Sequence, residues 1–289
     1  MISEKKIKIK LEGKLGKKIM SFTSLSGGCI SDAYKVTTED NTDYFLKYNS
    51  SSNDMFTKEA NGLNELSKAN AIRIPKVLSF NKDYILLEYI SGGNKKKIFF
   101  EEFGRSFAIL HKFHSEYFGF YEDNYIGSNP QINNADEKEK SDWVQFYFNK
   151  RILFQLELAE KLGNSTTELR KGISKLEEKI ENILTGSAEK PSLLHGDLWG
   201  GNYMIDETGS AVLIDPAVYY GHREADLGMT KLFGGFNSEF YTAYNDTFPL
   251  SDGYDYRENI YKLYHVLNHL NLFGGGYYSQ AISLIKYYI

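Results

Sequence analysis

The stretch of sequence that decides the fold runs from His195 to Asp215 and reads HGDLWGGNYMIDETGSAVLID. Its two apolar runs, YMI and AVLI, flank the turn-forming residues DETG, a pattern typical of a tight antiparallel hairpin. Such a hairpin returns the chain on itself, so Asn202 and Asp215 lie at its two feet. Amide and carboxylate oxygens suit Mg²⁺, which also keeps waters and takes phosphate oxygens. The stretch therefore predicts a magnesium site with Asn202 and Asp215 as ligands.

The polar residues of this stretch have the order and spacing of a kinase catalytic loop, H-x-D-x-x-x-x-N followed by an aspartate. In that pattern Asp197 accepts the proton of a substrate hydroxyl and orients it for in-line attack on the γ-phosphate of ATP. We expect His195 to orient the loop through backbone hydrogen bonds. A hairpin with incidental acidic residues is disfavoured, because three acid or amide positions in this order are far more specific than a lone motif.

Residues 1–90 predict a small β-rich unit with one main helix. Alternating side chains indicate strands, and apolar residues spaced three and four apart indicate an amphipathic helix. The expected strands cover 5–11, 33–38, 44–48 and 84–89, and the expected helix covers 55–69.

This N-terminal unit also contains residues that suit a nucleotide. Lys47 lies in a strand from which its ammonium could reach the α- and β-phosphates, and Glu59 on the following helix could hold it in place. Glu65 is the alternative partner on the same helix.

Two backbone segments complete the expected nucleotide site. The turn with Gly27, Gly28 and Cys29 lets main-chain N–H groups come close to phosphates, although it lacks both common phosphate-loop patterns. The backbone of Glu88, Tyr89 and Ile90 would face the adenine ring.

The connector SGGN at 91–94 separates the β-rich segment from a mainly helical one, and we place a hinge at about 88–94. Beyond it, the sequence predicts helices over 99–115, 141–160 and 166–184 and in the region 224–289. We therefore expect an α+β fold of two lobes. A small β-rich lobe covers 1–90, and a larger, mainly helical catalytic and substrate lobe covers 91–289.

The composition excludes several other classes of protein. With 34 basic and 38 acidic side chains the formal charge is −4, and no basic stripe indicates a nucleic-acid partner. No apolar run is long enough for a transmembrane helix, and the charged N-terminus does not resemble an export signal. Cys29 is the single cysteine, so no internal disulfide is possible and we expect a cytoplasmic location.

Several segments closely resemble the fructosamine kinase family, also called ketosamine-3-kinases. The resemblance covers nearly the whole chain, and the Trp inside the catalytic loop and the string YYGHREADL are its most specific features. The matching segments are GGCISDAYKV (27–36), FLKYN (45–49), FGFYEDNYIGSNPQIN (118–133), LLHGDLWGGN (193–202), IDPAVYYGHREADLGMTKLFGGF (214–236) and LYHVLNHLNLFGGGY (263–277).

The resemblance implies a bilobal protein-kinase-like fold. It also implies a kinase that uses ATP with Mg²⁺ and phosphorylates the 3-hydroxyl of a ketosamine, the adduct formed when a sugar glycates an amine or a protein lysine. The 3-phosphate product then sheds the sugar fragment, which leads to deglycation. It supports Asp197 as catalytic base and Asn202 and Asp215 as metal ligands. It also supports Lys47 with Glu59 as the phosphate-positioning pair.

Two departures from related patterns are visible. Gly200 stands where many members of the family have Ser, and Asp215-Pro216-Ala217 replaces the Asp-Phe-Gly of protein kinases without a long activation segment. We therefore expect a constitutively assembled enzyme. Some relatives with Cys in the phosphate turn form intermolecular disulfides, so we expect a monomer or a redox-linked dimer through Cys29.

The residues around the catalytic loop suggest how the acceptor is bound. The indole of Trp199 could stack on a sugar, and Glu224 could attract a cationic amine. Asp226 resembles the buried aspartate that accepts N–H bonds from the catalytic loop in kinase-like folds, which is a structural role. The predicted substrate-binding residues are Trp199, Tyr219, His222, Glu224, His265 and His269, with Tyr220 as a further aromatic.

Two other functions stay open on the sequence alone. One is a kinase for another hydroxylated amine, of the aminoglycoside or choline kinase type. The other is a catalytically inactive nucleotide-binding module, which the intact set of Lys47, Asp197, Asn202 and Asp215 disfavours.

Overall fold

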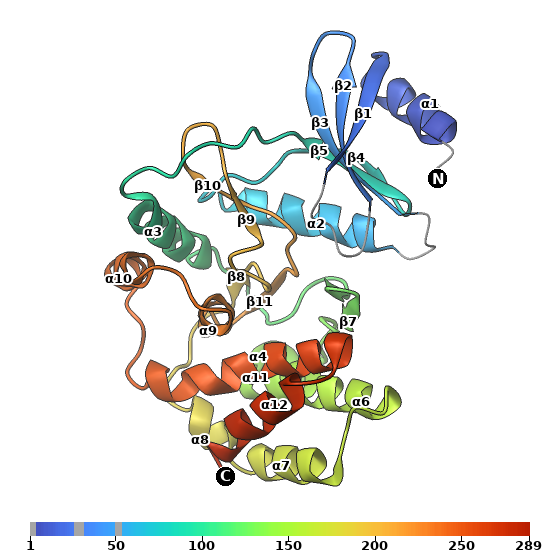
Figure 1. Cartoon of the computed structure of the whole chain (residues 1–289). Helices are drawn as coiled ribbons and strands as arrows, with labels where there is room; N and C mark the ends of the chain where they lie inside the picture. Colours follow the sequence, from blue (N-terminus) through green and yellow to red (C-terminus); the bar gives the residue numbers. More distant parts are fainter. Residues whose placement is uncertain (1–3, 26–31, 50–53) are drawn as a thin grey trace.

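The computed structural model describes residues 4–25, 32–49 and 54–289. Its N-terminal part is a five-stranded antiparallel sheet, drawn at the top of Figure 1. Alternate side chains of the fifth strand pack on opposite faces, so Leu86 joins one apolar cluster and Ile85 and Leu87 join another. In spatial order the strands are β1 (Ile19–Leu25), β2 (Asp32–Thr38), β3 (Asp43–Tyr48), β5 (Tyr84–Glu88) and β4 (Val77–Asn81).

The strand predicted over residues 5–11 is wrong, because that segment lies in helix α1 (Glu4–Leu15). Ile7 and Leu11 are one helical turn apart and both are buried against the sheet, whereas Ile9 is 68% exposed. Lysine is a good helix former and the four-residue spacing outweighs the Ile–Lys alternation. The edge of the sheet is instead formed by β1, which the sequence reading did not assign.

Helix α2 (Met55–Lys68) confirms the predicted amphipathic helix and lies beneath the sheet in Figure 1. Phe56, Ala60 and Leu63 pack against the apolar side chains of β5. On another face, a Cβ added to Gly62 would lie 3.3 Å from Val218 of the C-terminal part. The helix therefore contacts both the sheet and the segment that follows Asp215.

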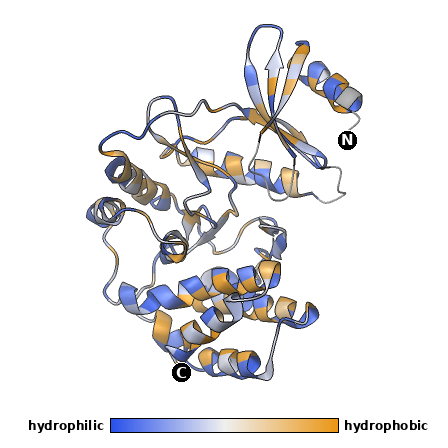
Figure 2. Ribbon diagram, viewed as in Figure 1, coloured by the Kyte–Doolittle hydropathy of each residue, from blue (hydrophilic) through white to orange (hydrophobic). Residues whose placement is uncertain are grey.

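The C-terminal part is mainly helical, as predicted, and together with the N-terminal sheet it confirms the α+β class. Its helices are α3 (Phe99–His111), α4 (Glu137–Ser141), α5 (Trp143–Tyr147), the π-helix η1 (Phe148–Leu153), α6 (Phe154–Lys161), α7 (Thr167–Glu177), α8 (Ile180–Leu184), α9 (Glu224–Leu232), α10 (Ser238–Thr247), α11 (Tyr254–Phe273) and α12 (Tyr277–Lys286). Hydrophobic and hydrophilic residues are interspersed along the lower helices, as the colours of Figure 2 show.

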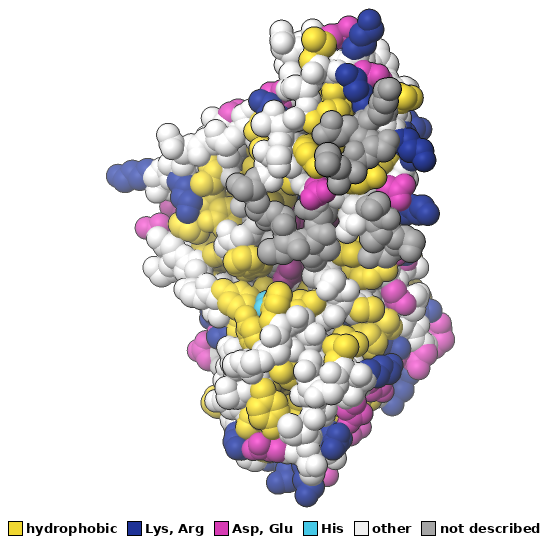
Figure 3. Space-filling model, turned by 45° about the vertical axis from the view of Figure 1, so that its right-hand side comes forward, with side chains coloured by type: hydrophobic (Ala, Val, Ile, Leu, Met, Phe, Trp, Pro, Cys, Tyr) yellow, Lys and Arg dark blue, Asp and Glu magenta, His cyan; other side chains and the backbone are white. Residues whose placement is uncertain are grey.

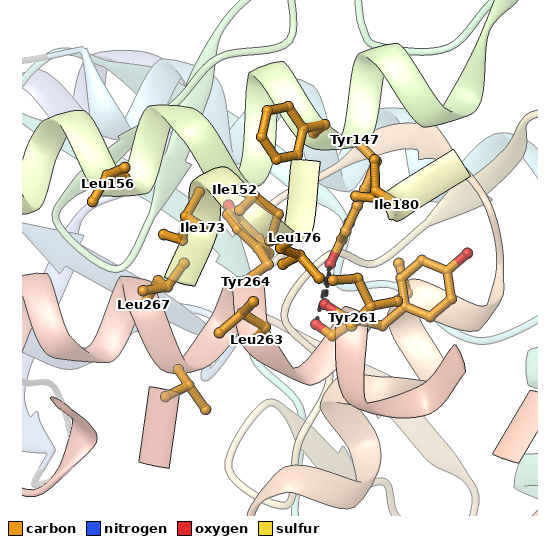
Figure 4. Close-up of a cluster of buried hydrophobic side chains, with 14 of the residues drawn as sticks. Tyr147, Ile152, Leu156, Ile173, Leu176, Ile180, Tyr261, Leu263, Tyr264 and Leu267 are labelled. Atoms are coloured by element: carbon orange, nitrogen blue, oxygen red, sulfur yellow. Dashed lines mark hydrogen bonds between the residues drawn. The ribbon is translucent and has the colours of Figure 1, made fainter. Parts of the chain in front are cut away.

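The largest apolar cluster packs α11 against the segment from α5 to α8 (Figure 4). Tyr147 is buried there, and its hydroxyl donates to the backbone oxygens of Ile260 at 3.0 Å and Tyr261 at 3.3 Å. Burial on this scale is the dominant favourable contribution to folding. Within the described ranges, no helix is long and apolar enough to cross a membrane.

Three short two-stranded ladders hold the loops of the site. They pair β6 (Asn124–Ile126) with β7 (Asn129–Gln131), β8 (Ser192–Leu194) with β11 (Tyr219–Gly221), and β9 (Tyr203–Ile205) with β10 (Ala211–Leu213). The β9–β10 pair is the predicted hairpin, and β6, β7 and β11 were not predicted.

Candidate active site

The loop after β8 is hydrogen-bonded to the irregular segment between β10 and β11. His195 Nε2 lies 2.9 Å from the backbone oxygen of Ile214, and the Ala217 N–H donates to the His195 oxygen at 2.9 Å. Gly196 has a φ of +82°, and any Cβ there would overlap the Ala217 carbonyl, so glycine is required. These contacts bring both ends of the 195–217 stretch together.

Asp197 and Asn202 lie side by side within this stretch. The Asn202 Nδ2 donates to the Asp197 backbone oxygen at 2.7 Å and to its Oδ2 at 3.0 Å. With both N–H bonds directed at Asp197, the Asn202 Oδ1 is the atom left to accept or to ligate. Burial raises the pKa of Asp197 well above its usual range, with Asp215 and Asp226 adding to the rise and the Asn202 bond opposing it. A raised pKa suits a carboxylate that accepts a proton near neutral pH.

Lys47, Glu59 and Asp215 meet between the two parts of the chain. Lys47 Nζ on β3 lies 2.7 Å from Glu59 Oε1 on α2 and also contacts Asp215 Oδ1. The alternative partner Glu65 is turned away and accepts from the Tyr220 hydroxyl at 2.8 Å. The structure therefore joins Lys47 to Glu59 rather than to Glu65.

The electrostatics of this triad keep its ammonium charged. Burial lowers the pKa of Lys47, but the two carboxylates outweigh it and hold the pKa above its usual range. Burial and the nearby Asp215 charge raise the pKa of Glu59. One cation between two carboxylates leaves a negative charge in excess, which favours a bound divalent ion.

The residues that would hold Mg²⁺ fit that ion in type. Asn202 and Asp215 each offer a hard oxygen, and part of the Asp215 side chain is exposed. Among the described residues there is no cluster of three or more His, Cys, Asp or Glu that could hold a metal ion. An ion at Asn202 and Asp215 therefore depends on waters and nucleotide phosphates for its remaining ligands.

Asp226, at the start of α9, lies beneath the catalytic loop. Its carboxylate accepts from the N–H groups of His195 and Gly196, both at 2.7 Å, and lies 3.2 Å from His111 Nε2. Burial favours the neutral acid, yet His111, His195 and the N–H donors outweigh it and lower the pKa of Asp226. The charged carboxylate therefore fixes the backbone that carries Asp197. His111 is a further residue of this network, and no motif in the sequence indicated it.

The expected adenine segment lies at the end of β5. The Glu88 N–H donates to the backbone oxygen of Lys76 at 2.9 Å, and the Glu88 carboxylate forms an ion pair with Arg73 at 2.6 Å. Arg73 also bonds Asp206 and Glu207 of the β9–β10 turn at 3.0 and 2.9 Å. Arg73 thus connects β5 to the hairpin, and no motif in the sequence indicated this.

Two other predicted segments are placed as follows. Tyr89 lies beneath Lys35, whose Nζ is 5.0 Å from the ring centroid, and Ile90 is buried. The predicted phosphate turn with Gly27, Gly28 and Cys29 lies outside the described residues.

Trp199, within the catalytic loop, is half-exposed, and its ring forms a row of contacts with Phe233, His269 and Tyr277 that we call the aromatic ridge. The Trp199 ring meets Phe233 edge-on with 5.8 Å between ring centroids. The centroid distance is 4.9 Å from Phe233 to His269 and 5.2 Å from His269 to Tyr277. Phe233 is 41% exposed and was not among the predicted residues. Figure 3 shows hydrophobic side chains gathered around a histidine on one face of the molecule.

Three residues predicted to bind the acceptor are instead in the core. Tyr219, His222 and Glu224 are at most 2% exposed. Glu224 forms a bidentate pair with Arg257 at 2.6 and 2.8 Å, so its charge is already compensated and is not available to attract an amine. All three predicted residues lie in the stretch 217–230, which is buried throughout because β11 and α9 pass through the centre of the domain. Tyr220 is likewise buried.

The two helical histidines have different environments. His265 is 2% exposed, its Nδ1 has no hydrogen-bond partner among the residues that the structure describes, and burial lowers its pKa to about 3. Its position favours core packing over the predicted substrate contact. His269 is partly exposed in the aromatic ridge, and its Nδ1 bonds the His265 oxygen at 2.7 Å.

Comparison with known proteins places the chain in a family. The family model described as fructosamine kinase matches residues 3–289. A chloroplastic protein-ribulosamine 3-kinase of Oryza sativa subsp. japonica is 40% identical over 290 residues, which covers 96% of this chain and 81% of the rice protein.

Solved structures agree with this assignment. The crystal structure of a candidate fructosamine-3-kinase from Thermobifida fusca has 29% identity and a TM-score of 0.89, with 97% of each chain covered. A choline kinase from Streptococcus pneumoniae, 18% identical with a TM-score of 0.64 over 99% of each chain, shares the fold. The Asp197 loop, the Asp215 hairpin and the Lys47 pair thus occur in a chain that belongs to the fructosamine kinase family.

Proposed function

We propose that this chain transfers the γ-phosphate of ATP to the 3-hydroxyl of a ketosamine, either a small molecule or a glycated lysine of a protein. The observation that carries the proposal is the meeting of Lys47, Asp197, Asn202 and Asp215 at one place, from elements far apart in the sequence. The name of the rice relative, a protein-ribulosamine 3-kinase, supports the ketosamine as acceptor.

Asp197 acts as the base in this reaction. As the 3-hydroxyl oxygen attacks the γ-phosphorus, its proton passes to the Asp197 carboxylate, the new O–P bond forms, and the bond to the β-phosphate oxygen breaks to release ADP. Asn202 keeps the Asp197 carboxylate oriented through its Nδ2. The raised pKa of Asp197 makes it a better proton acceptor than an exposed aspartate.

Lys47 and the two oxygen ligands position the nucleotide. Glu59 holds the Lys47 ammonium, which binds the α- and β-phosphates. Asn202 and Asp215 would hold Mg²⁺. When bound, that ion neutralises charge on the phosphate oxygens and keeps the γ-phosphate in line with the acceptor.

The acceptor is bound beside Trp199. Its exposed indole face suits the carbon-bearing face of the sugar chain, and the neighbouring Phe233 and His269 extend an aromatic surface from it. Because an aromatic face attracts a cation, the ridge could also contact the substrate ammonium. This replaces the predicted role of Glu224.

A panel of acceptors tests the proposal. The protein is incubated with Mg·ATP and ribulose-lysine, fructose-lysine or kanamycin, and ³¹P NMR locates the new phosphate. We expect phosphate on the 3-oxygen of a ketosamine and none after Asp197→Asn. Turnover of kanamycin alone would make the chain an aminoglycoside-type kinase, and Mg·ATP binding with no transfer would make it an inactive module.

Two further predictions concern the protein in the cell. We propose a cytoplasmic location, which fractionation tests. We also propose that the chain is a monomer unless Cys29 joins two copies. The intermolecular disulfide is excluded if an oxidised sample runs as a monomer on a non-reducing gel and keeps full kinase activity.

A further inference from the structure

Two side-chain amides of the β6–β7 hairpin donate hydrogen bonds to the segment that follows Asp215. Asn124 Nδ2 donates to the Val218 oxygen at 2.7 Å, and Gln131 Nε2 donates to the Ala217 oxygen at 2.9 Å. Ala217 and Val218 are buried, and a buried carbonyl without a donor is costly. The two amides therefore supply donors that this segment needs.

The two amides are held in one orientation by their own partners. The Tyr264 hydroxyl of α11 donates to Gln131 Oε1 at 2.8 Å, which leaves the Gln131 Nε2 to donate to the Ala217 oxygen and to Asn124 Oδ1 at 2.8 Å. Asn133 Nδ2 also donates to Asn124 Oδ1 at 2.9 Å. All four side chains are at most 6% exposed, so water does not compete for these bonds.

Asp215 is the residue that depends on this support. Its φ is +54°, a left-handed conformation that is uncommon for a residue with a side chain, and Pro216 next to it has no N–H to donate. Upstream, the Ile214 N–H donates to the Asn202 oxygen at 3.1 Å. Downstream, the Ala217 and Val218 carbonyls are held by Gln131 and Asn124. Such a backbone conformation persists only when its surroundings hold it on both sides.

We propose that Gln131 and Asn124 are positioning residues for the Asp215 carboxylate. They act through the backbone of residues 216–218 and touch neither nucleotide nor acceptor. By fixing that backbone they keep Asp215 oriented toward Asn202 and Lys47. The inference rests on the proposed function, because it takes Asp215 as a metal ligand.

The test replaces Gln131 by a side chain of similar length without donors, Gln131→Met. The matched control is Tyr147→Phe, because Tyr147 is also completely buried and its hydroxyl donates to backbone oxygens, but to those of Ile260 and Tyr261 in α11 rather than to those of residues 216–218. For each variant we measure the melting temperature, kcat, both KM values, and Mn²⁺ binding in the presence of ADP by electron paramagnetic resonance. Asp215→Asn serves as the reference for loss of the ligand.

We expect Gln131→Met to weaken Mn²⁺ binding and to lower kcat, each by about tenfold or more, as is typical when support for a metal ligand is removed. KM for the acceptor should change less than twofold. Tyr147→Phe should lower the melting temperature and leave kcat and Mn²⁺ binding within about twofold of the wild type. If Gln131→Met does not fold, Asn124→Leu is compared with Tyr147→Phe by the same criteria.

Equal kinetic and metal-binding changes in the Gln131 and Tyr147 variants would overturn the inference, and so would wild-type Mn²⁺ binding in a folded Gln131→Met or Asn124→Leu protein. The proposed function fails differently. In that case Asp215→Asn itself binds Mn²⁺ as the wild type does.

Discussion

Replacing Asp226 by Asn tests whether a buried charge holds the catalytic loop. Asn has the same shape, but one of its two oxygens becomes an NH₂ group that faces a backbone donor. Asp226 Oδ1 accepts from Gly196 and Oδ2 from His195, each at 2.7 Å, so only one of these two bonds survives the change.

The size of the effect follows from these contacts. A hydrogen bond to a charged group contributes about 1.5–3 kcal/mol and a neutral one about 1 kcal/mol. Losing one charged bond of about 2 kcal/mol and weakening the other by about 1 kcal/mol lowers the free energy of unfolding by about 3 kcal/mol. In a domain of this size that corresponds to a fall in melting temperature of about 6–12 °C. Because the freed loop carries Asp197, kcat should fall by about 100-fold.

The pH dependence of the melting temperature gives a second test of the Asp226 charge. The pKa of Asp226 is lowered in the folded protein, so its stabilisation is present above the ordinary aspartate range and is lost as the pH falls through the lowered value. The difference in melting temperature between wild type and Asp226→Asn should therefore hold at neutral pH and close only below about pH 4.

The control is Glu224→Gln, two residues away on the same helix. It breaks the buried pair with Arg257 and should cost about 3–5 kcal/mol of stability. Calorimetry and steady-state kinetics at a temperature where both variants are folded compare the two. The reasoning is refuted if Glu224→Gln lowers kcat as much as Asp226→Asn does, since loss of stability alone would then explain the result.

Three more predictions concern the site itself. Glu59→Gln frees the Lys47 ammonium and should lower kcat/KM for ATP by about 100-fold, measured by a coupled ADP assay, while the melting temperature changes little. Gly201→Ala places a Cβ that overlaps the ring carbons of Trp199, so KM for the ketosamine should rise about tenfold with KM for ATP unchanged. Gly200→Ala, where a Cβ meets no described atom within 4 Å, should have no effect, and equal changes in both KM values would exclude Trp199 from the acceptor site. Because burial raises the pKa of Asp197, kcat/KM for the ketosamine should fall on acidification at a pH above the usual aspartate range, and a profile that stays flat down to pH 4 would contradict Asp197 as base.

The local features of the sequence predicted the hairpin and α2 well. The DETG turn between two apolar runs and the helical spacing after Met55 are local signals, and the structure has both elements there. The N-terminal helix was missed because Ile7 and Leu11 fit both the alternating and the four-residue period, and only the packed sheet decides between them.

The burial of polar residues could not be predicted from local pattern. Glu224 belongs to the segment YYGHREADL, whose aromatic and charged residues suggested a substrate pocket. Its partner Arg257 is far along the chain. The same holds for Asn124 and Gln131, which appear as ordinary polar loop residues until the chain folds over residues 217 and 218. Charge compensation between distant residues depends on tertiary structure.

The buried course of residues 217–230 has a consequence for how the enzyme is controlled. In protein kinases the segment after the metal-binding aspartate is exposed and its phosphorylation turns activity on or off. Here the corresponding residues form the centre of the domain, so a modifying enzyme could reach them only by unfolding it. Phosphorylation of this segment, which controls protein kinases, therefore has no counterpart in this enzyme.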